Sequence, residues 1–172
     1  PDVLTFETDV LDEDLTLAGP VIANLKVSIS GTDADFVVKV IDVFPDNFQY
    51  SEANSSPTGR SGVASYPMNG YQMLVRGEIM RGKFRNSFTT PEPFKPNKIE
   101  TVEFALPDVA HTFKKGHRLM IQVQSSWFPL ADRNPQQFMN IYEAKPEDFK
   151  KATIKIYHDG SNSSSVSLPI MR

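Results

Sequence analysis

Few side chains in this sequence could do chemistry, and none stands in a spacing typical of an active site. A serine hydrolase needs Gly-x-Ser-x-Gly at a strand-to-helix turn, because that strained turn lifts the Ser hydroxyl clear of the sheet. The closest string is Gly59-Arg60-Ser61-Gly62, which has a different spacing and lies in a segment rich in Ser, Asn, Gly and Pro. We interpret it as a surface turn and expect no catalytic residue in this chain.

The metal-binding residue types are also scattered. His111, His117 and His158 form no His-x-x-x-His pair or other close spacing, so structural hydrogen bonds are the favoured interpretation. The acidic run 12–14 lacks the alternating carboxylate and glycine pattern of a calcium loop and is interpreted as a solvated loop. The chain has no Cys, which excludes disulfides, thiolate metal sites and a Cys nucleophile. We therefore expect no metal and no cofactor.

Asp42 is the acidic residue that the pattern places in the interior, because it shares the strand phase of Val38 and Val40. A buried carboxylate must be paired or strongly hydrogen-bonded. The favoured interpretation is an internal salt bridge, and contact with a ligand is the alternative. The candidate partners are four arginines: Arg76, Arg81, Arg85 and Arg118.

The segment 125–135 is the most unusual string in the chain. It contains the only Trp, Trp127, two prolines and the pair Asp132-Arg133 at the end of a predicted strand. This combination indicates an aromatic anchor followed by a tight polar turn. Both an interface and a packed corner of the domain fit it.

The composition excludes several classes of partner. The 18 basic residues are spread among 21 acidic ones, and the net charge is −3. Nucleic-acid binding needs clustered Lys and Arg, so no nucleic-acid partner is expected. No apolar run approaches the roughly 20 residues of a membrane span, so no membrane partner is expected either.

These residues must be held by strands, because the dominant hydrophobic period is two. Seven segments or more alternate in this way, and none shows a sustained helical period, although residues 146–149 could form one short helical turn. The pattern predicts an all-β fold, an antiparallel jelly-roll β-sandwich of the galactose-binding type. The alternating segments are 21–29, 35–44, 71–80, 102–106, 119–127, 154–157 and 166–170, and in 71–80 one face would hold Tyr71, Met73, Val75 and Ile79.

Three long connections, 45–70, 86–98 and 128–150, separate the strands, and loops of this length are usually functional or mobile. No repeat or linker divides the chain, so residues 1–172 are predicted to be a single domain. The start at Pro1 suggests a fragment of a larger chain.

Specific strings resemble a known family. Residues 116–119 and 122–129, followed by 132–135, closely resemble the C-terminal domain of X-Pro dipeptidyl-peptidases, cocaine esterases and α-amino acid ester hydrolases. The resemblance spans nearly the whole chain in the right order. Further matching strings are 35–39, 42–46, 77–81 and 167–170.

The resemblance implies a non-catalytic jelly roll that follows an α/β-hydrolase domain, with a Ser, Asp and His triad that lies entirely upstream. It implies a serine hydrolase as the parent, a dipeptidyl-peptidase or acyl esterase, and an additional strand before Pro1. The partner would be that upstream domain, with homo-oligomerisation through the parent as a further role. The jelly roll would support the hydrolase, shape its substrate entrance or mediate assembly. Members of the family are often exported, so a periplasmic or secreted parent fits.

The segment 127–135 is the expected docking edge. We expect Trp127 to be mostly buried within the domain, and Phe128, Leu130 and Arg133 to point outward. The alternative is a carbohydrate-binding module, which would present Trp127, Tyr66 or Tyr50 as a flat exposed platform. Whether Trp127 is exposed or packed would separate these two functions.

Overall fold

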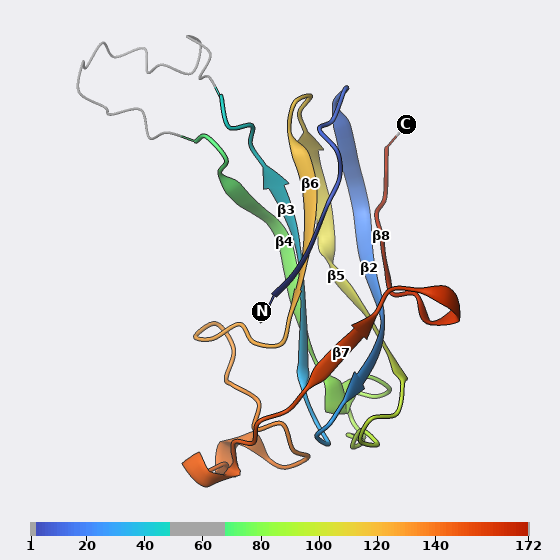
Figure 1. Cartoon of the computed structure of the whole chain (residues 1–172), viewed down its shortest axis with the longest axis vertical. Coiled ribbons are helices and arrows are strands. Elements are labelled where there is room, and N and C mark those ends of the chain that lie inside the picture. Colours follow the sequence, from blue (N-terminus) through green and yellow to red (C-terminus); the bar gives the residue numbers. More distant parts are fainter. Residues whose placement is uncertain (1–2, 49–67, 172) are drawn as a thin grey trace, which may run out of the picture.

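The computed structural model describes residues 3–48 and 68–171, which form two packed antiparallel sheets (Figure 1). The first sheet has the strand order β1-β6-β3-β4, and the second has the order β5-β2-β7, with β8 also pairing with β2. The strands are β1 (Val3–Glu7), β2 (Leu15–Ile29), β3 (Asp35–Val43), β4 (Gln72–Arg81), β5 (Glu100–Phe113), β6 (Arg118–Gln124), β7 (Ile154–Tyr157) and β8 (Ser165–Ser167). The only helical elements in these ranges are 3₁₀ turns, and one of them, Pro146–Asp148, is the short turn expected there.

The chain passes from one sheet to the other at most of its connections, as in a jelly roll, so the predicted all-β sandwich is confirmed. Apolar residues from the inner faces of both sheets form one core, because successive strand residues point to opposite faces. The largest fully buried side chains include Phe36, Phe94 and Phe113. Phe94 comes from the connection before β5, so that loop also fills the core.

The longest ladder joins β2 to β5 and contains a bulge. Gly19 pairs with Val109 while Val21 pairs with Leu106, so one strand holds an extra residue there. Gly19 has φ of 124°, a conformation that side chains with a Cβ rarely adopt. The bulge bends the long strands so that both halves of the ladder stay against the core.

A second bulge changes the strand phase that the sequence predicts for β4. Val40 pairs with Arg76 and Ile41 pairs with Leu74, which leaves Val75 as the extra residue. Val75 packs against the core, but Ile79 pairs with Val37 on the outer face. The prediction that Ile79 shares a face with Val75 is therefore wrong, because one bulge reverses the alternation.

Candidate docking surface

The interior of the sandwich contains a carboxylate bound by two histidines. Asp42 is 2% exposed. Its Oδ1 lies 2.7 Å from Nδ1 of His117, and its Oδ2 lies 2.9 Å from Nε2 of His111. His111 comes from β5 and His117 from the turn before β6, so the cluster ties the two sheets together. Asp42 has the inward position that its strand phase predicts.

The prediction that Asp42 pairs with an arginine is wrong. Arg81 pairs with Asp35 and Arg85 pairs with Glu100. Arg76 donates to backbone carbonyls in β4 and β5, and Arg118 donates to the carbonyl of Thr8. Sequence reasoning treated each histidine as a local structural residue and so missed that two of them converge on one carboxylate across the sheets.

A second buried polar cluster fixes the segment that follows β6. Asn134 is 7% exposed, and its Nδ2 donates to Asp33 Oδ2 at 3.1 Å and to Asp35 Oδ1 at 2.8 Å. The guanidinium of Arg81 bonds both Asp35 and the carbonyl of Asp132. The string Asp132-Arg133-Asn134-Pro135 is therefore held from inside the domain by the residues that begin β3.

Burial raises the pKa of the Asp33 and Asp35 carboxyls above 3.8, because desolvation disfavours the charged form. The hydrogen bonds from Asn134 act in the opposite direction and favour the carboxylates. Removing Asn134 would leave both acids without this donor. The loop and the two acids therefore depend on one another.

Trp127 lies outside the core, against the outer face of the β1-β6-β3-β4 sheet. It is half-buried, and its ring covers Gly77, where a Cβ would stand 2.6 Å from the ring. Lys39 Nζ lies 4.6 Å from the ring centroid, and burial lowers the pKa of this amine. The sequence predicts that Trp127 is mostly buried within the domain, and the structure packs it on the outer face of the sheet and not in the core between the sheets. Its strand phase does not apply, because β6 ends at Gln124 and the chain turns outward.

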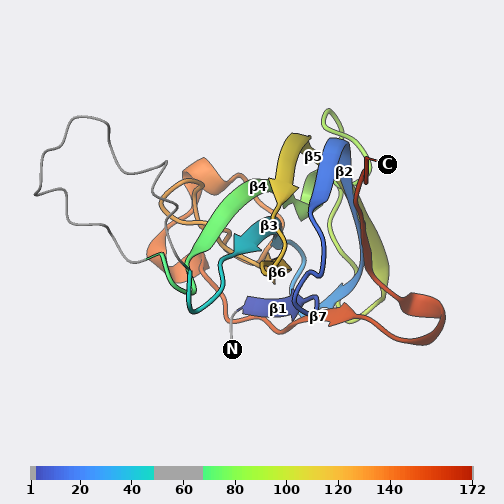
Figure 2. The same ribbon diagram turned by 90° about the horizontal axis from the view of Figure 1, so that it is seen from above.

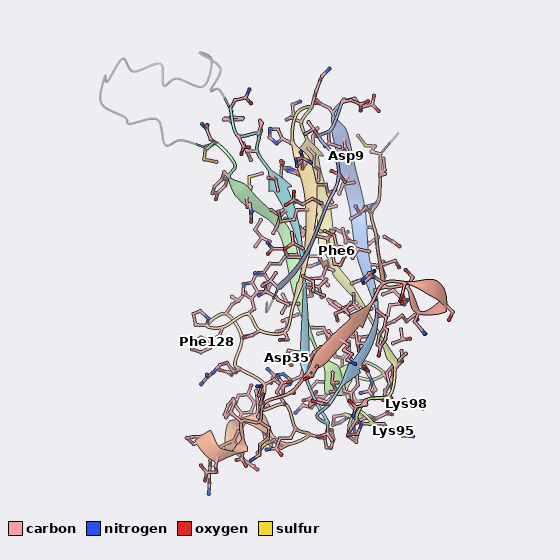
Figure 3. The ribbon with its side chains drawn as sticks, viewed as in Figure 1. Phe6, Asp9, Asp35, Lys95, Lys98 and Phe128 are labelled. Carbon is pink, nitrogen blue, oxygen red and sulfur yellow. The ribbon has the colours of Figure 1, made fainter. Side chains whose placement is uncertain are left out.

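The residues after Trp127 point away from the sandwich. Phe128 is 64% exposed and points outward in Figure 3. Leu130 is 70% exposed, and Arg133 is also exposed. The Arg133 guanidinium lies 5.8 Å from the ring centroid of Phe128 and 5.3 Å from that of Phe149, within the range of cation–π attraction. We call Trp127, Phe128, Leu130 and Arg133 the docking loop. It is apolar at the tip and rigidly held at the base.

The two outer faces of the sandwich differ in polarity. On the β5-β2 ladder, outward side chains bond one another, as Asn24 does to Glu103 and Lys26 to Thr101. On the β6-β3 ladder, Ile41 pairs with Met120 on the outward side, and these two side chains are 5% and 1% exposed. The outer face that carries Trp127 is therefore formed in part by apolar side chains.

The remaining candidate residues do not come together within residues 3–48 and 68–171. No group of three or more His, Asp or Glu residues there could hold a metal ion, and no helix there is long and apolar enough to cross a membrane. The acidic run 12–14 is exposed, and Asp14 bonds Lys114 there. His158 is exposed at the end of β7. The string Gly59-Arg60-Ser61-Gly62, Tyr50 and Tyr66 lie outside the described residues.

Comparison with known proteins gives this geometry its context. The family described as "X-Pro dipeptidyl-peptidase C-terminal non-catalytic domain" matches residues 1–167. The chain belongs to this family. The resemblance stated from the sequence strings is thereby confirmed, and so is the expectation that the domain itself is non-catalytic.

Individual proteins are also similar to nearly the whole of this chain. The cocaine esterase of Rhodococcus sp. (strain MB1 Bresler) is 30% identical over 171 residues, which cover 99% of this chain and 26% of the esterase. An α-amino acid ester hydrolase is similar with a TM-score of 0.86 at 46% identity. An aminopeptidase from the marine sediment archaeon Thaumarchaeota archaeon is similar with a TM-score of 0.86 at 41% identity. Each of these two matches covers 99% of this chain and 26% of the other.

The chain thus spans about a quarter of the length of the relatives that it matches, 26% in each case. In those relatives the domain is part of a larger chain with an N-terminal hydrolase domain. Nothing in these comparisons supports a carbohydrate-binding module. Trp127 is itself covered on one side by Gly77 and Lys39, so it is no free platform.

Proposed function

We propose that this domain is the C-terminal support of a larger serine hydrolase of the X-Pro dipeptidyl-peptidase or α-amino acid ester hydrolase type, and that the docking loop is its contact with the hydrolase portion. Acyl transfer would be performed by a Ser nucleophile and a His base upstream. The observation that carries the proposal is the docking loop itself, an apolar tip on a base that is hydrogen-bonded into the core.

The rigidity of the base supports a binding role. In the free domain the Phe128 and Leu130 side chains remain in contact with water, so burying them on docking would be favourable. A loop that is already ordered loses little conformational entropy when it docks. Asn134 and Pro135 are buried immediately after the exposed tip, so the tip is fixed at its C-terminal side. Aromatic residues and Arg are enriched at protein interfaces, and Phe128 with Arg133 supplies both.

The outer face of the β1-β6-β3-β4 sheet extends the proposed contact. Leu74 on this side is 49% exposed and lies beside the buried pair Ile41 and Met120. The polar outer face of the β5-β2 ladder would remain in water. The domain would therefore approach the hydrolase with one face only.

The experiment uses the full-length chain with Phe128→Ser and Leu130→Ser combined. Loss of buried anchor residues costs more than about 1 kcal/mol each at an interface. We expect faster thermal inactivation of ester or amide hydrolysis and easier proteolytic release of the domain. The matched control is Phe88→Ser, because Phe88 is 78% exposed in a different loop.

Three outcomes separate the roles that a C-terminal support could have. Lower stability in the double variant with unchanged kcat and KM supports docking alone. A higher KM with unchanged stability would assign the docking loop to the substrate entrance instead. A changed sedimentation coefficient would assign it to contact between copies. Behaviour identical to Phe88→Ser would overturn the proposal.

A further inference from the structure

The sandwich is open along one edge. β1 ends the first sheet, and β7 lies at the end of the second sheet, with β8 beside it on β2. Between these edges run two adjoining hollows of about 300 Å³ and about 360 Å³, which share Val123 and Ile156 (Figure 2 shows β1 beside β7). We call the two hollows together the β1–β7 groove.

Apolar side chains form much of the walls and floor of the β1–β7 groove. Leu4 and Phe6 of β1 form one wall and are 38% and 45% exposed. Ile156 forms part of the opposite wall, and the floor reaches the core residues Leu25 and Phe36. Leu25 and Phe36 are each 1% exposed, so the exposed apolar surface of the groove belongs mainly to Leu4 and Phe6. Contiguous exposed apolar surface of this kind marks a site of interaction in soluble domains.

The backbone of β1 adds a second observation. β1 pairs with β6 along one edge, and no strand of the described residues pairs with its other edge, the one that faces the β1–β7 groove. All five residues of β1 are exposed. An unpaired edge offers N–H and C=O groups to a further extended segment.

We propose that the β1–β7 groove receives an extended apolar segment of the hydrolase portion that precedes this domain in the longer chain, laid along the free edge of β1; this inference rests on the proposed function. Main-chain hydrogen bonds to β1 would supply affinity. Alternate side chains of the segment would enter the two hollows, because strand side chains alternate between faces.

Position in the chain favours this occupant over a second copy. The matched relatives carry about three quarters of their length outside this domain, which covers 26% of each, and the family domain is the C-terminal one. β1 is the first strand of the described residues, so a hydrolase portion that preceded Val3 would join the domain at the wall of the groove. Tethering of this kind gives an effective concentration on the order of millimolar, which a second copy in dilute solution does not reach.

The chemistry of the lining fits the same occupant. No Lys, Arg, Asp or Glu of the described residues lines either hollow, and the polar groups are Ser, Thr, Gln and His158. The ring of His158 contacts Phe6 edge-on at 6.4 Å between centroids, which joins the two walls near one end. An uncharged apolar segment therefore fits, whereas phosphate groups or an acidic peptide would find no opposite charge.

The test places p-benzoyl-phenylalanine at position 6 or 166 of the full-length chain, with position 88 as the matched control. Phe6 and Val166 line the β1–β7 groove, and Phe88 is exposed in another loop. We expect irradiation to cross-link positions 6 and 166 to one extended peptide of the hydrolase portion. Mixing isotopically light and heavy chains distinguishes links within one chain from links between two copies.

A second readout is amide exchange of β1 in the full-length chain with Leu4→Ser and Phe6→Ser combined. We expect exchange at β1 to become about tenfold faster, which corresponds to about 1.4 kcal/mol, whereas Phe88→Ser leaves it unchanged. Cross-links only between copies, only inside this domain, or nowhere would overturn the inference. If these results appear while the docking-loop variant still destabilises the hydrolase, the proposed function stands and only the groove assignment fails.

Discussion

The indole ring of Trp127 lies directly on Gly77, so that a Cβ added to Gly77 would stand 2.6 Å from Cη2 of the ring. The contact is made by a strand residue of β4 and by the residue that begins the docking loop. Glycine at this strand position lets the ring approach the sheet. The aliphatic stem of Lys39 borders the same space, since its Cγ would lie 3.4 Å from that Cβ.

Gly77→Ala should therefore displace Trp127 from the sheet. We expect a loss of about 1 to 3 kcal/mol in the free energy of unfolding, the range for an added methyl group in a packed site. Trp127 is the only Trp, so its emission should shift to the red. The control is the same substitution in a Trp127→Leu background, where Ala should be neutral or stabilising. An unshifted emission in Gly77→Ala would contradict the contact.

Asp42→Ala should be strongly destabilising. It leaves His111 and His117 facing an empty acceptor position, and each buried unsatisfied donor costs about 1 to 3 kcal/mol. We expect a total loss of about 3 kcal/mol in urea unfolding. Asp9→Ala is the control, because Asp9 is exposed and such changes usually stay within about 0.5 kcal/mol. Equal losses in the two variants would show that the cluster does not hold the sheets together.

Much of this fold could be predicted from the sequence, because period-two alternation is a local signal and both sheets obey it over most of their length. It failed at Ile79, where a single bulge reverses the phase, and at Trp127, where the strand ends first. The alternation correctly predicted that Asp42 points inward. It could not predict the partners of Asp42, because these depend on which strands face each other across the sandwich. The burial of Asn134 and its bonds to Asp33 and Asp35 gave no signal in the sequence, because an Asn before Pro is typical of an ordinary turn.

The pair Asp33 and Asp35 should give the domain a measurable pH dependence. Burial raises the pKa of both carboxyls above 3.8, so the folded domain binds more protons than the unfolded chain between 3.8 and the raised values. The stability that these groups contribute is complete below 3.8 and is lost as the pH rises through that window.

Asp35→Asn isolates this contribution, because the amide cannot titrate and keeps one oxygen for Asn134. We expect the free energy of unfolding of the unsubstituted domain to rise relative to that of Asp35→Asn as the pH falls from neutral to about 4. Urea unfolding of both proteins at several pH values measures this difference. A difference that stays constant, or that changes in the opposite direction, would mean that the bond from Arg81 outweighs burial at this site.

Asn134→Ala should release the docking loop without touching its exposed tip. Asp33 and Asp35 lose the Nδ2 group that donates to them. The Gln136 N–H loses its acceptor, the Asn134 Oδ1 at 2.8 Å. Buried groups that lose their partners cost about 1 to 3 kcal/mol each. We expect the domain to lose about 3 kcal/mol and proteases to cut first between residues 127 and 135.

The matched control is Asn140→Ala in the same connection. Asn140 is exposed and caps a 3₁₀ turn by accepting from the Tyr142 N–H, a role worth about 1 kcal/mol. In the full-length chain, Asn134→Ala should also reproduce the faster inactivation of the Phe128→Ser and Leu130→Ser variant, because docking needs a fixed loop. If Asn134→Ala lowers stability no more than Asn140→Ala does, the buried cluster does not order the loop, and Phe128 and Leu130 would dock without preorganisation.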